Sequence, residues 1–411
     1  GYQDTFVEEA RLASDPGGKF DWVIGGFYLD RSHDVNYFYR SSPEFLAARG
    51  ITGLPDEYYQ RQYNHAISHE LAAFGELTHH INERFWLTAG LRYGQVDARA
   101  DIEGGYNSAY LTYALTGRSG PLAMTQIAPA AGVKAEGRRP SYKLSASFQP
   151  IPELTTYATW STGFRAPIVN AFAGRRSTVN PNDIVIPNGA STDKIENYEL
   201  GAKGTWLEGR LTTNLAVYLI DWSDIQVQAN RVSDSVQFAT NIGAARSKGF
   251  EFEIAAIPVT NLHVGLNGSF NDAHVTELTA QEAAISGAVS DARLSAPKFQ
   301  GAVYLNYGMD FTPSVRGSFG LAFQHVDSYP GSFPRVPGQP NQVASTYGYT
   351  DSYNNVNLTL GATMGELDVT AYVENLGDDH SITYVHPEAF LANRAGTMRP
   401  RTVGLRVNYD F

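Results

Sequence analysis

The sequence contains no cysteine, and this absence excludes several kinds of protein at once. Without thiols there is no disulfide framework, no thiolate metal site and no cysteine nucleophile. Charged residues are also scarce, at 18% of the chain, below the roughly 25% of an average soluble protein. No stretch reaches the roughly 18 apolar residues that a transmembrane helix requires. Transmembrane helices are therefore excluded.

Positive charge is in deficit too, with 31 Lys and Arg against 42 Asp and Glu and a net charge of −11. The chain has no basic stripe that could neutralise phosphates, so nucleic acid is not expected as a partner. Residues 1–20 lack the basic start and apolar core of a signal peptide, so we expect an exported protein to have a longer precursor. Glycine and aromatic residues, by contrast, are plentiful, with 39 Gly, 24 Tyr and 21 Phe.

Alternation of apolar and polar side chains is the dominant pattern. At the C-terminus Val403, Leu405, Val407, Tyr409 and Phe411 share one face of an extended chain, and the residues between them are polar or glycine. The same two-residue period recurs in residues 84–94, 211–219, 299–307, 315–324 and 367–373. This period predicts strands with one apolar and one polar face, and helical spacing fits none of these segments.

Fifteen such strands are predicted along the chain. They are residues 1–14, 20–40, 65–81, 84–104, 139–151, 154–170, 193–206, 211–229, 236–257, 262–277, 295–309, 315–329, 349–363, 366–380 and 398–411. Short connections with turn residues, such as 15–19 and 364–365, alternate with long ones, such as 41–64, 105–138 and 171–192. Short turns at one end and long loops at the other predict an all-β, antiparallel up-and-down transmembrane β-barrel.

A soluble β-sandwich or β-propeller is the alternative architecture. Propeller blades would repeat at about 40–50 residues with comparable loops on both sides, and sandwiches seldom contain hairpins this long. Several segments exceed the roughly 9–11 residues that cross a bilayer, so they could project beyond it as ribbons that support loops.

The number of strands carries a further implication. Fifteen antiparallel strands cannot close on themselves without one parallel pair, and single-chain bacterial barrels have even strand numbers. The first segment begins at the long-loop end, and the last finishes at the short-turn end. We therefore expect an odd number of strands before Gly1, and we interpret residues 1–411 as the C-terminal part of a longer barrel.

Several motifs resemble the barrel of TonB-dependent outer-membrane receptors. They are Ser161–Pro167 (STGFRAP), Asn197–Gly201 (NYELG), Ile220–Gln226 (IDWSDIQ), Asn241–Glu251 (NIGAARSKGFE) and Glu374–Leu376 (ENL). The ending from Arg399 to Phe411 resembles the last strand of that family, whose terminal aromatic residue is used by the barrel assembly machinery. The resemblance covers essentially the whole chain, and the motifs occur in the order of the family.

The resemblance implies a 22-stranded barrel in the Gram-negative outer membrane, with long extracellular loops, short periplasmic turns and an N-terminal plug. If fifteen of the 22 strands lie in residues 1–411, seven strands precede Gly1. Seven is odd, as expected above from the even strand numbers of bacterial barrels. We expect no plug domain in residues 1–411. Asp4-Thr5-Phe6-Val7 resembles a TonB box, but hairpins that begin by Phe20 leave no room for a plug after it. The implied partners are outer-membrane lipid, the TonB complex through the missing N-terminal region, and the assembly machinery through Phe411.

The resemblance also implies a function, the active uptake of a large scarce solute, with a ferric siderophore as the leading class. Carbohydrate, cobalamin and haem are alternative solutes, and a passive porin-like channel is a rival function. An outer-membrane hydrolase is a second rival, suggested by Asp378-Asp379-His380 near Ser381. Because a receptor needs neither a nucleophile nor a general base, we predict no enzymatic activity, no catalytic residues and no cofactor. His65 and His69 would lie about 13 Å apart on a strand, too far to share a metal.

Recognition of the solute is assigned to arginines and aromatic residues of the long loops. Arginine can pair bidentately with carboxylate, catecholate or hydroxamate oxygens, and tyrosine rings can stack on sugars or aromatic chelators. The candidate ligand-binding residues are Tyr58, Tyr59, Tyr63, Tyr106, Tyr110, Tyr113, Arg165, Phe172, Arg175, Arg176, Phe333 and Arg335. A second set of polar side chains is expected to face a hydrated lumen: Arg92, Lys143, Glu199, Lys203, Glu251, Glu253, Arg316, Gln324 and Arg406.

Overall fold

The computed structural model describes residues 1–40, 42–48, 58–107, 124–170, 173–177, 179–233, 236–344, 347–385 and 395–411. One antiparallel sheet of fifteen strands dominates it, and each strand pairs with its neighbour in chain order. Its strands are β1 (Tyr2–Ala13), β2 (Phe20–Arg40), β3 (Tyr58–Asn82), β4 (Phe85–Asn107), β5 (Met124–Ile151), β6 (Leu154–Gly163), β9 (Lys194–Trp206), β10 (Leu211–Asn230), β11 (Gln237–Ala256), β12 (Leu262–Glu277), β13 (Phe299–Thr312), β14 (Val315–Val326), β17 (Tyr353–Met364), β18 (Leu367–Glu374) and β21 (Thr402–Tyr409). The predicted all-β, up-and-down architecture is confirmed.

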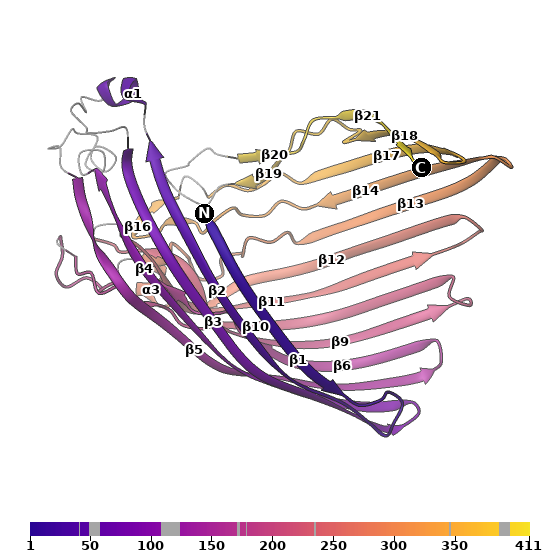
Figure 1. Cartoon of the computed structure of the whole chain (residues 1–411), viewed down its shortest axis with the longest axis horizontal. Coiled ribbons are helices and arrows are strands. Elements are labelled where there is room, and N and C mark those ends of the chain that lie inside the picture. The colour runs from indigo at the N-terminus through magenta and orange to yellow at the C-terminus, as the bar shows by residue number, and fades with distance from the viewer. Residues whose placement is uncertain are drawn as a thin grey trace.

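The two ends of the sheet differ in the length of the connections between strands. The hairpin turns gather at one end, and the long connections gather at the other (Figure 1). The long connections carry three two-stranded hairpins, β7 (Ile168–Val169) with β8 (Gly189–Ala190), β15 (Arg335–Val336) with β16 (Gln339–Val343), and β19 (Ile382–Val385) with β20 (Ala395–Thr397). They also carry the short helices α1 (Pro43–Ala48) and α3 (Ala280–Ser286). Neither helix is long and apolar enough to cross a bilayer, and the same holds throughout the described residues.

The short turns owe their tightness to residues in left-handed backbone conformations. Gly17 has φ 92° between β1 and β2, and Gly209 has φ 86° between β9 and β10. Glycine adopts positive φ without the steric cost that a Cβ imposes, so these positions reverse the chain within a few residues. Asn261, at φ 64°, does the same between β11 and β12, because asparagine tolerates this region better than most residues.

The two faces of the sheet differ in polarity, as the alternation predicts. Leu405 on β21 is in register with Ala371 on β18, which is in register with Leu360 on β17, and all three lie on what we call the apolar face. Leu405 and Leu360 are 66% and 61% exposed, so this face is uncovered by protein. The opposite side is the polar face, and Arg406 lies on it because it alternates with Leu405.

The polarity of the faces reverses in the long-loop halves of the longest strands. Leu91 lies on the apolar face of β4, but beyond residue 94 the same face carries Asp97 and Arg99. On the other face Val96 and Ala100 are buried, at 4% and 6% exposure. A strand that is apolar outward in lipid must become polar outward in water, so the reversal marks where β4 leaves the bilayer. The prediction of ribbons that project beyond the membrane is consistent with this reversal.

Several strand boundaries differ from the sequence-based expectation; β3, for example, begins at Tyr58 rather than at residue 65. The strand β5 begins at Met124 rather than at residue 139, because its first half pairs with the extension of β4 through two register shifts. The predicted strand 366–380 ends at Glu374, because Asn375 adopts φ 50° and its amide donates to the Asp379 and Arg399 carbonyl oxygens. The strand β6 ends at Gly163 rather than at residue 170, since the chain turns there into the β7–β8 hairpin.

The edge strands of the sheet are β1 and β21. Hydrogen-bonded pairing between these two strands is not found among the described residues. Because fourteen reversals separate them, β1 and β21 run in the same direction.

Candidate functional site

The polar face carries ion pairs between successive strands. The Arg92 guanidinium lies 2.5 Å from a Glu70 carboxylate oxygen, and the Lys143 ammonium lies 2.9 Å from Glu76. These residues come from β3, β4 and β5, whose register places them on one face. Pairing of this kind holds long charged side chains against the wall, so the wall presents fixed charges rather than mobile ones.

An acidic stretch of the polar face lies over β9 to β12. The Tyr157 hydroxyl donates to Glu199 at 2.7 Å, and Lys203 lies 5.5 Å from the centre of the Tyr157 ring. Asn214 donates to Glu253 at 3.1 Å. These side chains and Glu251 line a polar hollow of about 660 Å³. All nine residues predicted to face inward alternate with apolar-face residues on their strands, so that prediction is confirmed: Arg92, Lys143, Glu199, Lys203, Glu251, Glu253, Arg316, Gln324 and Arg406.

Asp193 organises the chain between β6 and β9. It is fully buried and accepts hydrogen bonds from the Arg165 backbone N–H (2.7 Å), Arg165 Nε (2.5 Å) and Trp222 Nε1 (2.9 Å). The Arg165 guanidinium also lies 4.7 Å above the Trp222 ring, and Gln226 donates to the Ala166 and Ser191 carbonyl oxygens. A buried carboxylate thus holds the Arg165 guanidinium, while the Arg165 side chain stays 45% exposed, and its contact with solute stays a prediction.

A buried cation anchors the next part of the same connection. Arg231 is fully buried, and its Nη1 donates to the carbonyl oxygens of Arg175 (2.7 Å) and Ile184 (3.0 Å). Burial raises the pKa of Asp183, but hydrogen bonds from Ser233 and Ile184 and the Arg231 charge together lower it below its usual value. The segment 173–187 is thus tied to the β10–β11 connection by its backbone.

The anchored segment 173–187 carries one arginine whose side chain is exposed. Arg176 is exposed, and it forms no ion pair with any residue that the structure describes. The backbone carbonyl of its neighbour Arg175 is the one held by Arg231. Arg176 is therefore presented at the long-loop end on a fixed segment, a favourable position for an anionic ligand.

Phe333 and Arg335 belong to the connection between β14 and β17. Phe333 is partly buried and packs against a buried cluster that includes Ile225, Ile242 and Ala288. The Arg335 backbone N–H donates to Gly287 O at 3.0 Å, which attaches the β15–β16 hairpin to the end of α3. Helix α3 itself begins with a capping box between Thr279 and Glu282.

The tyrosine candidates are placed unevenly. Tyr63 is 39% exposed and lies on the face of β3 that carries Leu71 and Leu77, not on the polar face. Tyr58 and Tyr59 lie in β3 and Tyr106 lies in β4, but their side chains are outside the described part. Three further candidates lie outside the described residues altogether: Tyr110, Tyr113 and Phe172. Whether any of the twelve candidates contacts solute stays a prediction.

Residues 378–381 form a turn and not a paired serine and histidine. Asp379 Oδ1 accepts from the Ser381 amide (2.7 Å) and from the Ser381 hydroxyl, and these bonds lower the pKa of Asp379. His380 Nε2 lies 4.0 Å from Asp378, and its side chain is 63% exposed. The Ser381 hydroxyl thus donates to a carboxylate whose lowered pKa makes it a weak base, and no hydrogen bond between His380 and Ser381 is found among the described residues.

The histidines on β3 pair with separate carboxylates. His65 Nδ1 lies 2.6 Å from Asp34, and His69 Nδ1 lies 3.6 Å from Asp30, one pair above the other on the same face. Within the described residues no group of three or more His, Asp or Glu side chains has the geometry to hold a metal ion.

Sequence reasoning overlooked two groups at the long-loop end. Asp193 had no signal, because a single aspartate at the start of the predicted strand 193–206 gives no indication that it will be buried. Tyr347 and Tyr349 are 37% and 45% exposed, with ring centres 6.0 Å apart, and the alternation of aromatic residues around Gly348 could have indicated them.

Residues 2–376 match the family described as TonB dependent receptor-like, beta-barrel. The chain belongs to this family. Its members are β-barrels of the Gram-negative outer membrane, so the apolar face meets lipid and the polar face lines the lumen. The long-loop end is accordingly extracellular and the short-turn end periplasmic.

Solved TonB-dependent receptors share the fold at low sequence identity. The ferric yersiniabactin uptake receptor FyuA of Yersinia pestis is 19% identical with a TM-score of 0.72, and the chain covers 54% of it while FyuA covers 100% of the chain. The ferric-catecholate import receptor Fiu of E. coli K12, in its closed form, is 16% identical with a TM-score of 0.68, with 100% and 55% coverage. The chain thus spans about half the length of these solved receptors.

Curated relatives give closer matches over shorter stretches. The ferric-pyoverdine 358 receptor of Pseudomonas putida is 33% identical over 92 residues, which are 21% of this chain and 11% of that receptor. The ferric-pyoverdine M114 receptor PbuA of Pseudomonas sp. (strain M114) is 26% identical over 211 residues, which are 48% of this chain and 25% of that receptor.

Proposed function

We propose that the protein is an outer-membrane receptor for the TonB-dependent uptake of a large scarce solute, a ferric siderophore. The observation that carries the proposal is the match of residues 2–376 to the receptor family, together with two curated relatives named as ferric-pyoverdine receptors. A fixed polar wall and an exposed arginine at the extracellular end suit the anionic oxygen ligands of a ferric chelate.

The proposal extends to the domain organisation. Residues 1–411 would be the C-terminal part of a 22-stranded barrel, completed by seven strands and filled by a plug that lie elsewhere in the protein. The odd strand number and the coverage of about half of the solved receptors support this. The TonB complex would engage that plug-bearing region, and the exposed terminal Phe411, which stacks edge-on against Tyr409, would be available to the assembly machinery.

Uptake by the full-length protein tests the function. Cells that depend on it should accumulate radioactive iron supplied as ferric pyoverdine, and they should lose this uptake when TonB is deleted. The Arg176→Gln variant should bind the ferric chelate about ten-fold more weakly, because a charge-assisted hydrogen bond is worth about 1.5–3 kcal/mol. Lys134→Gln, an exposed cation on the outer face of β5, is the matched control and should bind normally.

Conductance separates the receptor from a passive channel. A plugged receptor should leave a planar lipid bilayer closed to ions, whereas a porin-like channel would give steady open steps. Steady conductance together with TonB-independent uptake would contradict the proposal.

A further inference from the structure

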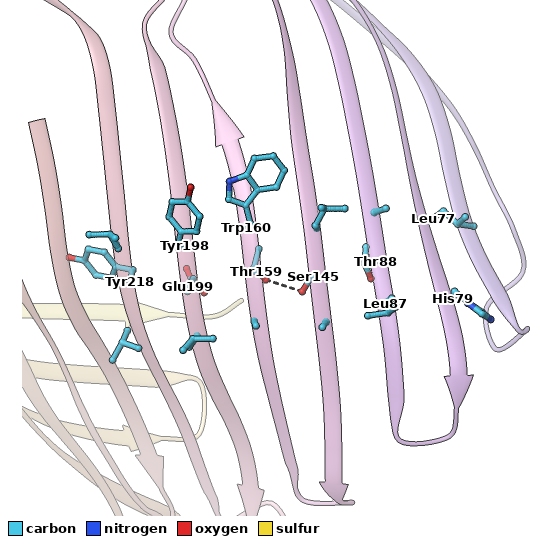
Figure 2. A pocket seen from close by; sticks show the side chains of 17 residues that line it. Leu77, His79, Leu87, Thr88, Ser145, Thr159, Trp160, Tyr198, Glu199 and Tyr218 are labelled. Atoms are coloured by element: carbon cyan, nitrogen blue, oxygen red, sulfur yellow. Dashed lines mark hydrogen bonds between the residues drawn. The ribbon is translucent and has the colours of Figure 1, made fainter. Parts of the chain in front are cut away.

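The apolar face contains a hollow that the transport function does not use. It encloses about 980 Å³ over β3, β4, β5, β6, β9 and β10. Figure 2 shows Leu77, Leu87, Trp160 and Tyr198 along these strands, together with the hydrogen bond between Ser145 and Thr159 (2.9 Å), two residues that alternate with the apolar-face residues. Because Leu87, Trp160 and Tyr198 all lie on the apolar face, the hollow opens toward lipid and not toward the lumen.

Small side chains form the floor of the hollow. Ala146 on β5 is in register with Ala158 on β6, Leu87 flanks this pair on β4, and Leu200 flanks it on β9. Two methyl groups between two isobutyl groups leave a depression, since side chains on one face of a sheet stand roughly side by side. In a bilayer the depression is filled by hydrocarbon, because an empty space forfeits dispersion contacts along its whole lining.

Aromatic rings bound the hollow toward the extracellular end. Tyr142 and Trp160 are stacked with ring centres 6.2 Å apart and an interplanar angle of 12°. Tyr198, in register with Trp160, is 45% exposed beside them. Tyrosine and tryptophan favour the boundary between hydrocarbon and headgroups, where a ring and a polar tip each find partners. These rings are therefore placed where an outer-leaflet chain passes from the headgroup region into hydrocarbon.

Two cations lie above the rings on the same face. Arg138 is four residues from Tyr142 on β5, is exposed, and makes no ion pair within the part of the chain that the structure describes. Lys194 is four residues from Tyr198 on β9, and its ammonium lies 3.1 Å from Glu196. The Glu196 charge is thus matched by Lys194, while the Arg138 guanidinium is available to a phosphate, which it can bind with two parallel hydrogen bonds.

The distance from cations to hollow fits one leaflet. Lys194 and Leu200 are six residues apart on β9, which is about 20 Å along a strand at roughly 3.3 Å per residue. A strand tilted by roughly 40° descends about 15 Å over that length. This depth is half of the roughly 30 Å hydrocarbon core, so an acyl chain that starts at the depth of these cations would end in the hollow.

We propose that this face binds one phosphorylated lipid of the outer leaflet, with an acyl chain in the Ala146–Ala158 hollow and a phosphate at Arg138. The inference uses the membrane location of the barrel and not its solute. The lipid would hold the β5–β6 hairpin and the start of β9 together from outside, opposite the Asp193 network on the inside.

Lipid retention by the full-length protein tests the proposal. Protein purified in a mild detergent is titrated with diphosphoryl lipid A, and bound lipid is measured by native mass spectrometry. Ala146→Leu with Ala158→Leu fills the hollow and should weaken binding at least ten-fold. Arg138→Gln leaves the hollow intact and should weaken binding about five-fold, with loss of the preference for phosphorylated over dephosphorylated lipid.

Ala371→Leu supplies the matched control, because Ala371 lies on the apolar face of β18, far along the sheet from the hollow. It should bind lipid A as the unaltered protein does. Heat-dependent gel mobility identifies any variant that fails to fold. If the double leucine variant fails to fold, lipid binding by Arg138→Gln decides the outcome. Equal binding by all variants, or tighter binding of phosphatidylglycerol than of lipid A, would overturn the proposal. Uptake of ferric pyoverdine is measured separately, so failure of one proposal does not imply failure of the other.

Discussion

Asp193 shows how a loop residue can matter more for structure than the exposed residues around it. Its carboxylate accepts three hydrogen bonds, two from Arg165 and one from Trp222, while its own side chain has no contact with solvent. A buried carboxylate is tolerated only when such donors replace its hydration. The network therefore depends on the charge at position 193, and not only on the shape of the side chain.

Replacement of this charge tests the dependence. In Asp193→Asn one oxygen becomes an amide that faces N–H donors, so the connection between β6 and β9 should lose about 2 kcal/mol of local stability. That loss corresponds to roughly 30-fold more frequent opening. Limited proteolysis of the detergent-solubilised full-length protein should show faster cleavage within residues 164–193. Glu196→Gln, which alters a partly exposed ion pair outside the network, should leave the rate unchanged. Equal rates for both variants would contradict the assigned role.

The roles of individual residues were less predictable than their positions in strands. Arg165 was predicted to meet solute because it is a loop arginine, yet its guanidinium is held by Asp193, 28 residues away. Phe333 is predicted as a loop aromatic residue, and it is partly buried against a core cluster. Composition indicates which side chains could bind a ligand, but contacts between distant loops decide which ones are already engaged. Arg176 is the candidate that the structure leaves exposed on an anchored segment.

At the scale of elements, alternation predicted strands wherever the bilayer enforces it. The fifteen predicted strands correspond to the fifteen strands of the sheet, because lipid on one side and a hydrated lumen on the other require a period of two. The first half of β5 was missed because residues 128–132, Ala-Pro-Ala-Ala-Gly, do not alternate. Outside the bilayer no lipid imposes the pattern, and pairing with β4 alone maintains the strand.

The β4 extension offers a test of the reversal in polarity. Val96→Asp would bury an uncompensated carboxylate between the ribbon and the β6–β9 connection, at a cost of about 3 kcal/mol or more. Proteolysis should then cut the β4–β5 ribbon readily, while the membrane-embedded barrel keeps its heat-dependent gel mobility. Lys134→Asp introduces the same carboxylate on the exposed face of β5 and should leave the ribbon resistant. Resistance in Val96→Asp would show that the inner face of the extension is hydrated.

At the scale of the whole molecule, the absence of cysteine makes strand pairing directly testable. Ala371→Cys with Leu405→Cys lies across the β18–β21 pair and should form a disulfide, since directly opposed residues have suitable spacing. The pair Leu12→Cys and Val407→Cys places one cysteine on each edge strand, β1 and β21. These two cysteines should form no disulfide if other strands of the protein complete the barrel. Efficient cross-linking of β1 to β21 would instead show that fifteen strands close on themselves. Gel mobility with and without reductant distinguishes the two results.

The unequal strand lengths give the barrel an oblique rim. The strand β5 has 28 residues, whereas β18 and β21 have 8 each, and Figure 1 shows the β2–β5 flank reaching much farther toward the long-loop end. Under the proposed function, a solute that approaches the β2–β5 flank meets a tall strand wall, whereas the β17–β21 flank is low in the described part of the chain. The path from outside to the lumen is shorter over that low flank. Screening by size should consequently be asymmetric around the mouth, with the tall flank acting as a barrier and the low flank as the direction of entry.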